Sequence, residues 1–149
     1  MNFKFSNLIL FIVFAGLIAF YFVSMPLMTK HNRYTMYFLN LQTNKVGTEA
    51  RYVLKNNNIS KEEQFVQELV FGPMDHNFYD YFKKGTKYNS CFVDGSILYV
   101  SFPKSIVPDV ESKMPFEQFY MLFKKNIFSN FSNIKEVCMF LDGVQVYAY

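Results

Sequence analysis

The sequence predicts an α+β domain, a two-layer sandwich in which two helices cover one face of a mainly antiparallel sheet, preceded by an N-terminal transmembrane helix. Hydrophobic residues make up 51% and aromatic residues 20% of the 149 residues, which is enough for a sizeable core. An uncharged apolar run opens the chain, and each of two helical patterns then lies between pairs of strand-like runs. The length allows one domain and an extension, so we assign residues 1–29 to a membrane anchor and residues 30–149 to the domain.

The N-terminal segment from Leu8 through Met28 contains no charged residue. At about 1.5 Å per residue, such a helix spans a hydrocarbon core of ~30 Å, whereas the apolar core of a signal peptide has only about 7 to 15 residues. A cleaved signal and a buried core helix are the alternatives. Leu17 and Phe22 precede the small residues Ala19 and Ser24 by two positions, which makes poor cleavage sites. We therefore expect an uncleaved single-pass anchor, with these apolar side chains in the bilayer: Leu8, Leu10, Ile12, Leu17, Phe20, Val23 and Met28.

The flanking charges do not orient this anchor. Lys4 lies on one side and Lys30 and Arg33 lie on the other, so the positive-inside rule gives a tie. The formal net charge of the whole chain is +3, and no basic stripe with interleaved aromatic residues is present. We therefore expect the membrane, and not a nucleic acid, as a partner.

The domain begins with a predicted hairpin and a helix. β-favouring residues fill 34–41 and 50–54, with turn-like residues between them at 44–47. Ser60 and Glu63 then form an S-x-x-E capping box, which marks the start of a helix. Gly72 and Pro73 stop this helix. Its apolar face consists of Phe65, Val66, Leu69 and Val70.

Two further hairpins surround the second predicted helix. The runs 87–93 and 97–102 are joined through Asp94-Gly95, a pair suited to the positive φ angles of a type I′ turn, and 137–141 and 144–149 flank Asp142-Gly143 in the same way. The helix between them begins near Pro115. Its apolar stripe consists of Phe116, Phe119, Tyr120, Phe123 and Ile127. The predicted order is therefore ββ-α-ββ-α-ββ, with all strands in one shared sheet.

Both faces of the predicted strands are apolar, although two helices can cover only one face. Ile97 and Tyr99 alternate with Leu98 and Val100. The uncovered face is a candidate contact surface for a protein partner or a second copy of the chain. Aromatic residues scattered over a small sheet can equally need no partner. The predicted surface consists of Ile97, Tyr99, Tyr147 and Tyr149.

A series of short motifs follows in order along the domain. They are Tyr37-Phe38, Glu49-x-Arg51, Leu69 through Pro73, Gly85-Thr86, Val93-Asp94-Gly95, Tyr99-Val100-Ser101, and Val137 through Leu141 followed by Asp142-Gly143. In this order they resemble the GerMN domain, which is named after the spore-germination protein GerM and is also found in bacterial envelope lipoproteins. One departure is Tyr99-Val100-Ser101-Phe102, where the family more often carries an acidic residue.

The resemblance implies an extracytoplasmic domain at the cell membrane and a role in envelope assemblies. The motif residues Gly72, Pro73, Asp94, Gly95, Asp142 and Gly143 fit structural roles at turns and at a helix end. Glu49 and Arg51 share one strand face and are expected to form a surface ion pair. We expect a non-enzymatic module for protein–protein interaction or assembly in the envelope. The alternative is a domain that binds or hydrolyses cell-wall material.

Catalytic and metal-binding constellations are weak in this sequence. The two histidines are His31, beside the anchor, and His76, in the segment Asp75-His76 followed by Asp80, which reads as a solvated loop more readily than as a metal or acid-base site. Cys91 and Cys138 lie in strand-like runs and can be inert buried thiols or a disulfide. We expect no catalytic residue, no metal and no cofactor.

Overall fold

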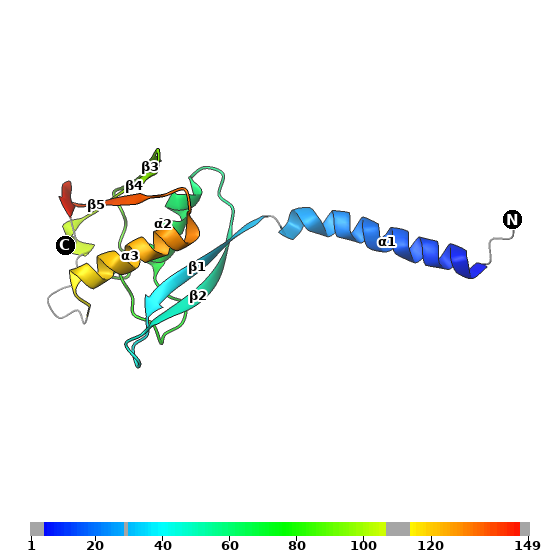
Figure 1. Ribbon diagram of the computed structural model, residues 1–149, viewed down its shortest axis with the longest axis horizontal. Helices are drawn as coiled ribbons and strands as arrows, with labels where there is room; N and C mark the ends of the chain where they lie inside the picture. The colour runs from blue at the N-terminus through cyan, green and yellow to red at the C-terminus, as the bar shows by residue number, and fades with distance from the viewer. Residues whose placement is uncertain (1–4, 29, 107–113, 147–149) are drawn as a thin grey trace. The chain divides into compact units, whose positions relative to one another are not determined.

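The elements of the chain follow the predicted order of strand pairs and helices. The computed structural model describes residues 5–28, 30–106 and 114–146 (Figure 1). The helices are α1 (Phe5–Met28), α2 (Lys61–Phe71) and α3 (Phe116–Asn130), with a short 3-10 turn η1 (Lys104–Ile106). The strands are β1 (His31–Leu39), β2 (Val46–Leu54), β3 (Ser90–Asp94), β4 (Ile97–Phe102), β5 (Glu136–Leu141) and β6 (Val144–Val146).

Helix α1 occupies the segment for which the anchor was predicted. Its large apolar side chains from Leu8 to Val23 are exposed. Within the described residues, no helix combines the length and the apolar character that a membrane crossing requires.

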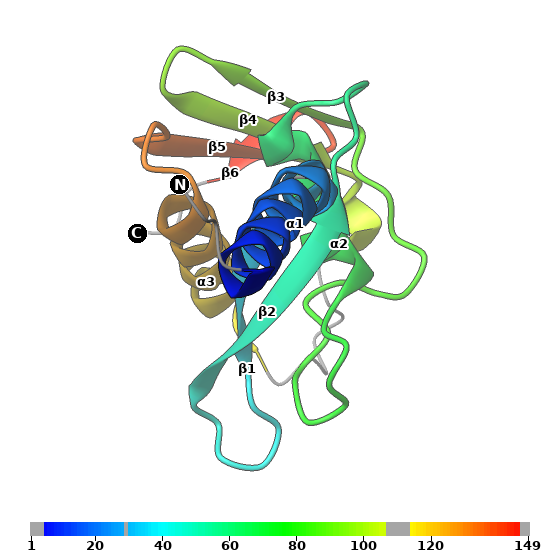
Figure 2. The same ribbon diagram turned by 90° about the vertical axis from the view of Figure 1, so that its right-hand side faces the viewer.

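The strands form two sheets, so the prediction of one shared sheet was wrong. β1 pairs with β2 alone, and the other strands form a four-stranded sheet in the order β3-β4-β5-β6. Figure 2 shows the β1–β2 hairpin set apart from this sheet. The second edge of β1 is occupied by side chains of α3, because Asn126 accepts a hydrogen bond from the Tyr37 backbone N–H and Asn130 accepts one from that of Thr35. This edge is therefore closed to another strand.

The four-stranded sheet is mainly antiparallel, as predicted, but one of its three strand pairs is parallel. β3 and β4 are antiparallel, as are β5 and β6, but β4 and β5 run parallel. The connection from β4 to β5 contains α3, which returns the chain to the starting end of the sheet. A crossover of this length places the next strand parallel to the previous one, whereas a short hairpin places it antiparallel.

The core lies between helices α2 and α3 and one face of the four-stranded sheet. Leu98, Val100 and Phe102 point from β4 into this core, and Val137 and Met139 point into it from β5; all five are at most 4% exposed. Phe102 packs edge-on against Phe123 of α3, with ring centroids 6.1 Å apart. The predicted apolar faces of both helices are confirmed except at Phe116, which is half-buried. Buried are Phe65, Val66, Leu69 and Val70 and also Phe119, Tyr120, Phe123 and Ile127.

The helix signals in the sequence are confirmed at residue level. The Ser60 hydroxyl accepts a hydrogen bond from the Glu63 backbone N–H at 3.0 Å, as a helix N-cap does. Gly72 ends α2 with φ of 85°, and its N–H donates to the Leu69 carbonyl at 3.2 Å. Pro115 directly precedes α3.

The two predicted Asp-Gly turns differ in register. Asp142 and Gly143 both have positive φ, 47° and 79°, and form the two-residue loop between β5 and β6 that a type I′ turn requires. The other turn was predicted one residue too early. Asp94 pairs with Ile97, so the loop consists of Gly95 and Ser96, and only Gly95 has a positive φ. Glycine at the first position is the pattern of a type II′ turn.

Candidate functional site

The outer face of the four-stranded sheet, opposite the core, carries a cluster of apolar side chains. Tyr99 stacks on Phe92 of the neighbouring strand, with ring centroids 5.1 Å apart and planes 12° apart. Phe92 is 52% exposed. The predicted surface residues Ile97 and Tyr99 are half-buried on this face, beside the half-buried Phe140. Tyr147 and Tyr149 lie outside the described residues.

The two cysteines lie on opposite faces of this sheet and are both free thiols. Cys91 pairs with Val100 on the core side, and Cys138 pairs with Tyr99 on the outer side. Burial raises the pKa of the Cys91 thiol to about 12, helped by the carboxylates of Glu63 and Glu62. Burial and Glu136 also raise the pKa of Cys138. The disulfide alternative was wrong, because the two thiols are free and lie on opposite faces of the sheet. Because both pKa values are raised, both thiols are protonated at neutral pH.

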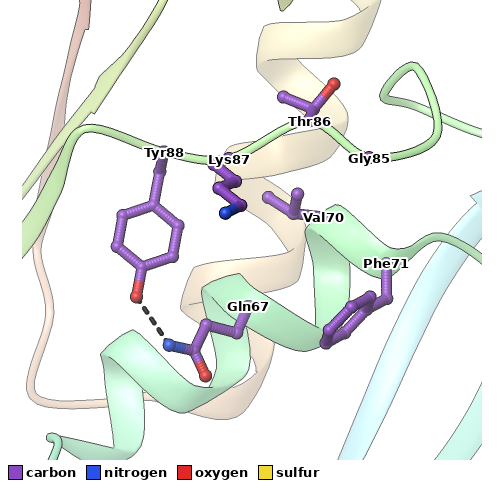
Figure 3. A pocket seen from close by; sticks show the side chains of 7 residues that line it. All are labelled: Gln67, Val70, Phe71, Gly85, Thr86, Lys87 and Tyr88. Carbon is purple, nitrogen blue, oxygen red and sulfur yellow. Dashed lines mark hydrogen bonds between the residues drawn. The ribbon is translucent and has the colours of Figure 1, made fainter.

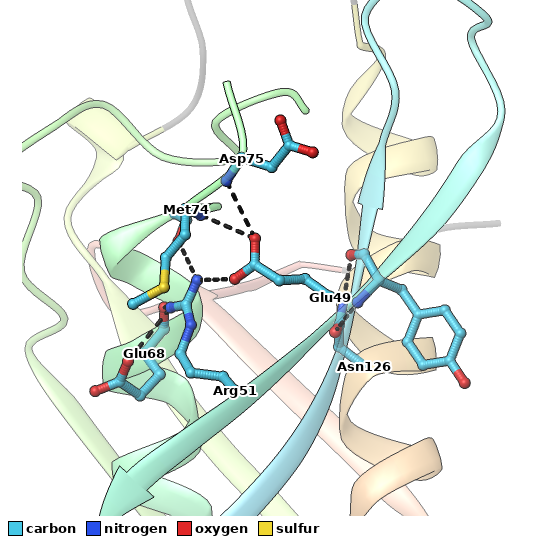
Figure 4. A network of polar contacts seen from close by, with 8 residues as sticks. Glu49, Arg51, Glu68, Met74, Asp75 and Asn126 are labelled. Carbon is cyan, nitrogen blue, oxygen red and sulfur yellow. Dashed lines mark hydrogen bonds and ion pairs between the residues drawn. The ribbon is translucent and has the colours of Figure 1, made fainter. Parts of the chain in front are cut away.

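Arg51 forms a buried clamp on the C-terminal end of α2 (Figure 4). One guanidinium nitrogen, Nη1, donates to the Glu68 carbonyl at 2.9 Å and to the Glu68 carboxylate at 3.3 Å. The other, Nη2, donates to the Gly72 carbonyl at 2.9 Å and pairs with Glu49. Arg51 thus binds two of the carbonyls that a helix end leaves without intrahelical partners.

Glu49 extends this clamp to the loop after α2. Its Oε2 accepts hydrogen bonds from the backbone N–H groups of Met74 and Asp75, at 2.9 and 3.3 Å. The ion pair with Arg51 was predicted, but its placement on the surface was wrong, since Arg51 is only 4% exposed. The reason is that α2 and the Gly72-Pro73 segment cover β2 at this point. The pair binds backbone groups at the end of α2 and in the following loop through charge-assisted hydrogen bonds.

A cleft lies between the C-terminal half of α2 and residues 85–88 (Figure 3). Its volume is about 520 Å³, and its lining residues are Gln67, Val70, Phe71, Gly85, Thr86, Lys87 and Tyr88. Figure 3 shows Lys87 pointing toward α2, between Val70 and Gln67. The Tyr88 hydroxyl accepts a hydrogen bond from Gln67 at 2.7 Å and donates one to Glu63 at 2.8 Å.

The cleft was not predicted from the sequence, although two of the quoted motifs line it. Val70 and Phe71 belong to the motif that ends α2, and Gly85 and Thr86 form the next motif along the chain. Their proximity in space depends on how the chain runs after α2. Phe71 is 77% exposed. The sequence does not predict this exposure, because Phe71 continues the apolar run of Leu69 and Val70.

The histidines do not belong to a metal site in the described part of the chain. Both His31 and His76 are exposed. In the loop after α2, the Asp75 carboxylate accepts hydrogen bonds from the backbone and side-chain N–H groups of Asn77, at 2.9 and 2.8 Å. No group of three or more His, Cys, Asp or Glu residues close enough to hold a metal ion exists among the described residues. Asp75 therefore stabilises its own turn.

The family was established by comparison with known proteins. The model of the Germane family, described as sporulation and spore germination, matches residues 35–146. The chain belongs to the Germane family. This match confirms the resemblance to GerMN domains and covers both the β1–β2 hairpin and the four-stranded sheet.

Two solved structures share the Germane fold of this chain. The first GerMN domain of the sporulation protein GerM from Bacillus subtilis superposes with a TM-score of 0.61 and 15% identity, over 77% of this chain and 86% of that one. The tandem GerMN domains of the same protein give a TM-score of 0.53 and 16% identity, over 77% of this chain and 40% of that one. At these identities the likeness shows the fold alone.

A curated relative of this Germane domain is an uncharacterized lipoprotein of Treponema pallidum (strain Nichols). It is 25% identical over 80 residues, which are 54% of this chain and 60% of the relative. The match thus spans about three fifths of that lipoprotein.

Proposed function

We propose that this chain is a membrane-anchored, extracytoplasmic Germane domain without enzymatic activity, which acts as a module for protein–protein interaction or assembly in the cell envelope. The observation that carries the proposal is the outer face of the four-stranded sheet. The helices pack on the opposite face, and the Phe92–Tyr99 stack lies on this one with more than half of the Phe92 side chain in contact with water. Aromatic side chains of this kind are enriched in the centres of protein interfaces.

Anchoring is supported by the composition of the N-terminal segment and by the lipoprotein among the relatives. No charge interrupts the sequence from Leu8 through Met28, and the large apolar side chains of α1 are exposed. Exposed apolar side chains around a whole helix favour a lipid environment. The relative from Treponema pallidum is named a lipoprotein, which supports a membrane location for this chain.

A protease-accessibility experiment tests the topology. The full chain is expressed in its host with a C-terminal tag, and protease is added to intact cells stripped of their wall. We expect loss of the tag while a cytoplasmic marker stays intact. Protection of the tag until the membrane is broken would refute the extracytoplasmic placement.

Site-specific photo-crosslinking of the full chain tests the interaction surface. A photoreactive amino acid replaces Phe92, and the control places it at Lys45, which is exposed in the β1–β2 connection. We expect a discrete adduct from position 92, either with a second copy or with an envelope protein, and none from position 45. Equal labelling of both positions, or no adduct at position 92, would contradict an interface on this face.

The second candidate is a domain that binds or hydrolyses cell-wall material. It is favoured by exposed aromatic rings such as Tyr52, at 67%, and Phe71, since such rings can pack against large ligands. Co-sedimentation with purified cell wall separates the two functions. Binding or turnover that is abolished by His76→Ala, at an exposed residue, would support the second candidate over the first.

A further inference from the structure

We propose that the cleft between α2 and residues 85–88 binds an extended peptide segment of a partner protein, in which an acidic side chain lies next to aliphatic side chains. This inference rests on the proposed function as an interaction module, and it adds a second site with a defined ligand chemistry. The cleft is separate from the Phe92–Tyr99 stack, because its lining residues come from α2 and from the segment before β3.

The size and lining of the cleft fit a small number of side chains. A volume of about 520 Å³ lies inside the range of about 300 to 1,000 Å³ that is typical of ligand sites. Val70 is 9% exposed, whereas Phe71 is 77% exposed at the C-terminal end of the helix. An aromatic ring left in water beside an apolar cleft gains from being covered by aliphatic groups.

The charges around the cleft favour an acidic group at one end. Lys83, Lys84 and Lys87 are exposed in one short segment, and none of them forms an ion pair with another residue of the described ranges. Two acidic groups of α2 are already engaged, since Glu63 binds Tyr88 and Glu68 binds Arg51. Glu63 repels a second carboxylate at the Tyr88 end, so the acidic side chain of the ligand belongs at the Lys87 end.

Both walls of the cleft are held in place by polar contacts. On the helix side, Arg51 fixes the carbonyls of Glu68 and Gly72, which bracket Phe71 in the chain. On the opposite side, the Thr86 backbone N–H donates to the Lys83 carbonyl at 3.0 Å, and Tyr88 is bound to Gln67 and Glu63. A site ordered before binding loses less conformational entropy when a ligand enters.

Peptide binding to the full chain in lipid nanodiscs tests this proposal. The probe is a fluorescein-labelled hexapeptide with one glutamate next to two leucines, measured by fluorescence anisotropy. Its two counterparts carry lysine in place of glutamate, or serines in place of the leucines. We expect saturable binding of the first peptide, with the lysine peptide weaker by about fivefold, as for a partly exposed charge pair. The serine peptide should be weaker by about tenfold or more.

Variants of the protein locate the binding. Lys87→Glu should weaken the glutamate peptide by about fivefold and reverse the preference in favour of the lysine peptide, an outcome that a misfolded protein cannot give. Phe71→Ser should weaken both by about tenfold. Lys45→Glu and Phe128→Ser make the same changes elsewhere on the surface and should leave binding unaltered.

Three results would overturn the proposal. The first is the absence of saturable binding, and the second is binding that Lys87→Glu and Phe71→Ser leave unchanged. The third is a dimer of this chain as the crosslinked product when the photoreactive amino acid replaces Phe71. If any of these results is found while position 92 still gives its adduct, the peptide site in the cleft is refuted and the proposed interaction module is still supported. Loss of the adduct at position 92 with intact peptide binding would instead remove the sheet surface.

Discussion

Replacing Asn126 with leucine should destabilise the domain far more than the same change at Asn130. Asn126 is fully buried in α3, where its amide accepts a hydrogen bond from the Tyr37 N–H at 2.8 Å and donates to the Tyr37 and Leu122 carbonyls at 2.9 and 3.0 Å. Asn130 makes the same pair of bonds to Thr35, at 2.9 and 2.7 Å, but is partly exposed. Leucine has the branched shape of asparagine and none of its polar atoms, but it is larger, so at the buried position some overpacking adds to the cost of the lost hydrogen bonds.

The loss of unfolding free energy in Asn126→Leu depends on which hydrogen-bonding groups around the side chain are left without any partner. After Asn126→Leu, the Tyr37 carbonyl keeps its hydrogen bond from the Tyr81 hydroxyl, and the Leu122 carbonyl keeps its helical partner. The Tyr37 N–H has no replacement. A buried donor without an acceptor costs about 1–3 kcal/mol, and with the other lost bonds the total is about 2–4 kcal/mol. At Asn130, water can bind the Thr35 groups, so we expect about 1 kcal/mol or less.

Urea unfolding of the full chain in mild detergent, followed by near-ultraviolet circular dichroism, measures both free energies of unfolding. Hydrogen exchange of the Tyr37 amide gives an independent local measure, which should show faster exchange in Asn126→Leu. Equal destabilisation by the two variants, or a loss below about 0.5 kcal/mol for Asn126→Leu, would refute the claim that burial of the Tyr37 N–H decides the cost.

Three further changes test other parts of the structure. Arg51→Met should destabilise the domain by about 3–5 kcal/mol in the same unfolding assay, since it strands Glu49 and Glu68 without their partner; a loss similar to that of an exposed Lys45→Met control would contradict the clamp. Gly72→Ala should cost more than Gly85→Ala, because both have positive φ, 85° and 83°, but only the Cβ at position 72 would meet another group, Asp80 Oδ1 at 2.6 Å. Asp80→Ala should recover part of the loss at position 72 and none at position 85. Iodoacetamide at pH 8 should label Cys91 only after unfolding, because its pKa of about 12 keeps the folded thiol protonated, and rapid labelling of the folded chain would disprove this. The same shift implies that the stability due to the protonated Cys91 thiol is complete below the ordinary thiol pKa near 9 and is lost as the pH rises toward 12.

Local signals in the sequence were sufficient for the helices and for the presence of each strand, although β1, β2 and β3 begin three or four residues away from their predicted starts. The Ser60 cap, the Gly72 stop and the apolar spacing of α2 and α3 each act within a few residues, so the sequence contains the whole cause. Strand β4 was predicted with its observed bounds, Ile97–Phe102, because a tight turn fixes its start and Pro103 fixes its end. Turn register was less certain, since Gly95 can occupy either central position of a two-residue turn.

Sheet membership and the site geometry could not be predicted in this way, because both depend on contacts between distant residues. The helical pattern does not single out Asn126, and only its bonds to Tyr37, 89 positions earlier, show why it is buried. Arg51 was assigned to the surface because charge usually indicates exposure. Its hydrogen bonds with Glu68 and Gly72 arise from the path of α2 over β2, which the pattern of neither element contains.

The pair of asparagines on α3 makes the β1–β2 hairpin a ribbon that can be extended on one side only. Four residues of helix advance by about 6 Å and two residues of strand by about 6.8 Å. Two amides spaced as N-x-x-x-N can therefore replace two peptide groups of a missing strand, and the mismatch in advance grows with each further turn. Chains that add a strand to this hairpin, whether foreign or identical, must approach through β2, and the two asparagines therefore protect the β1 edge against edge-to-edge aggregation.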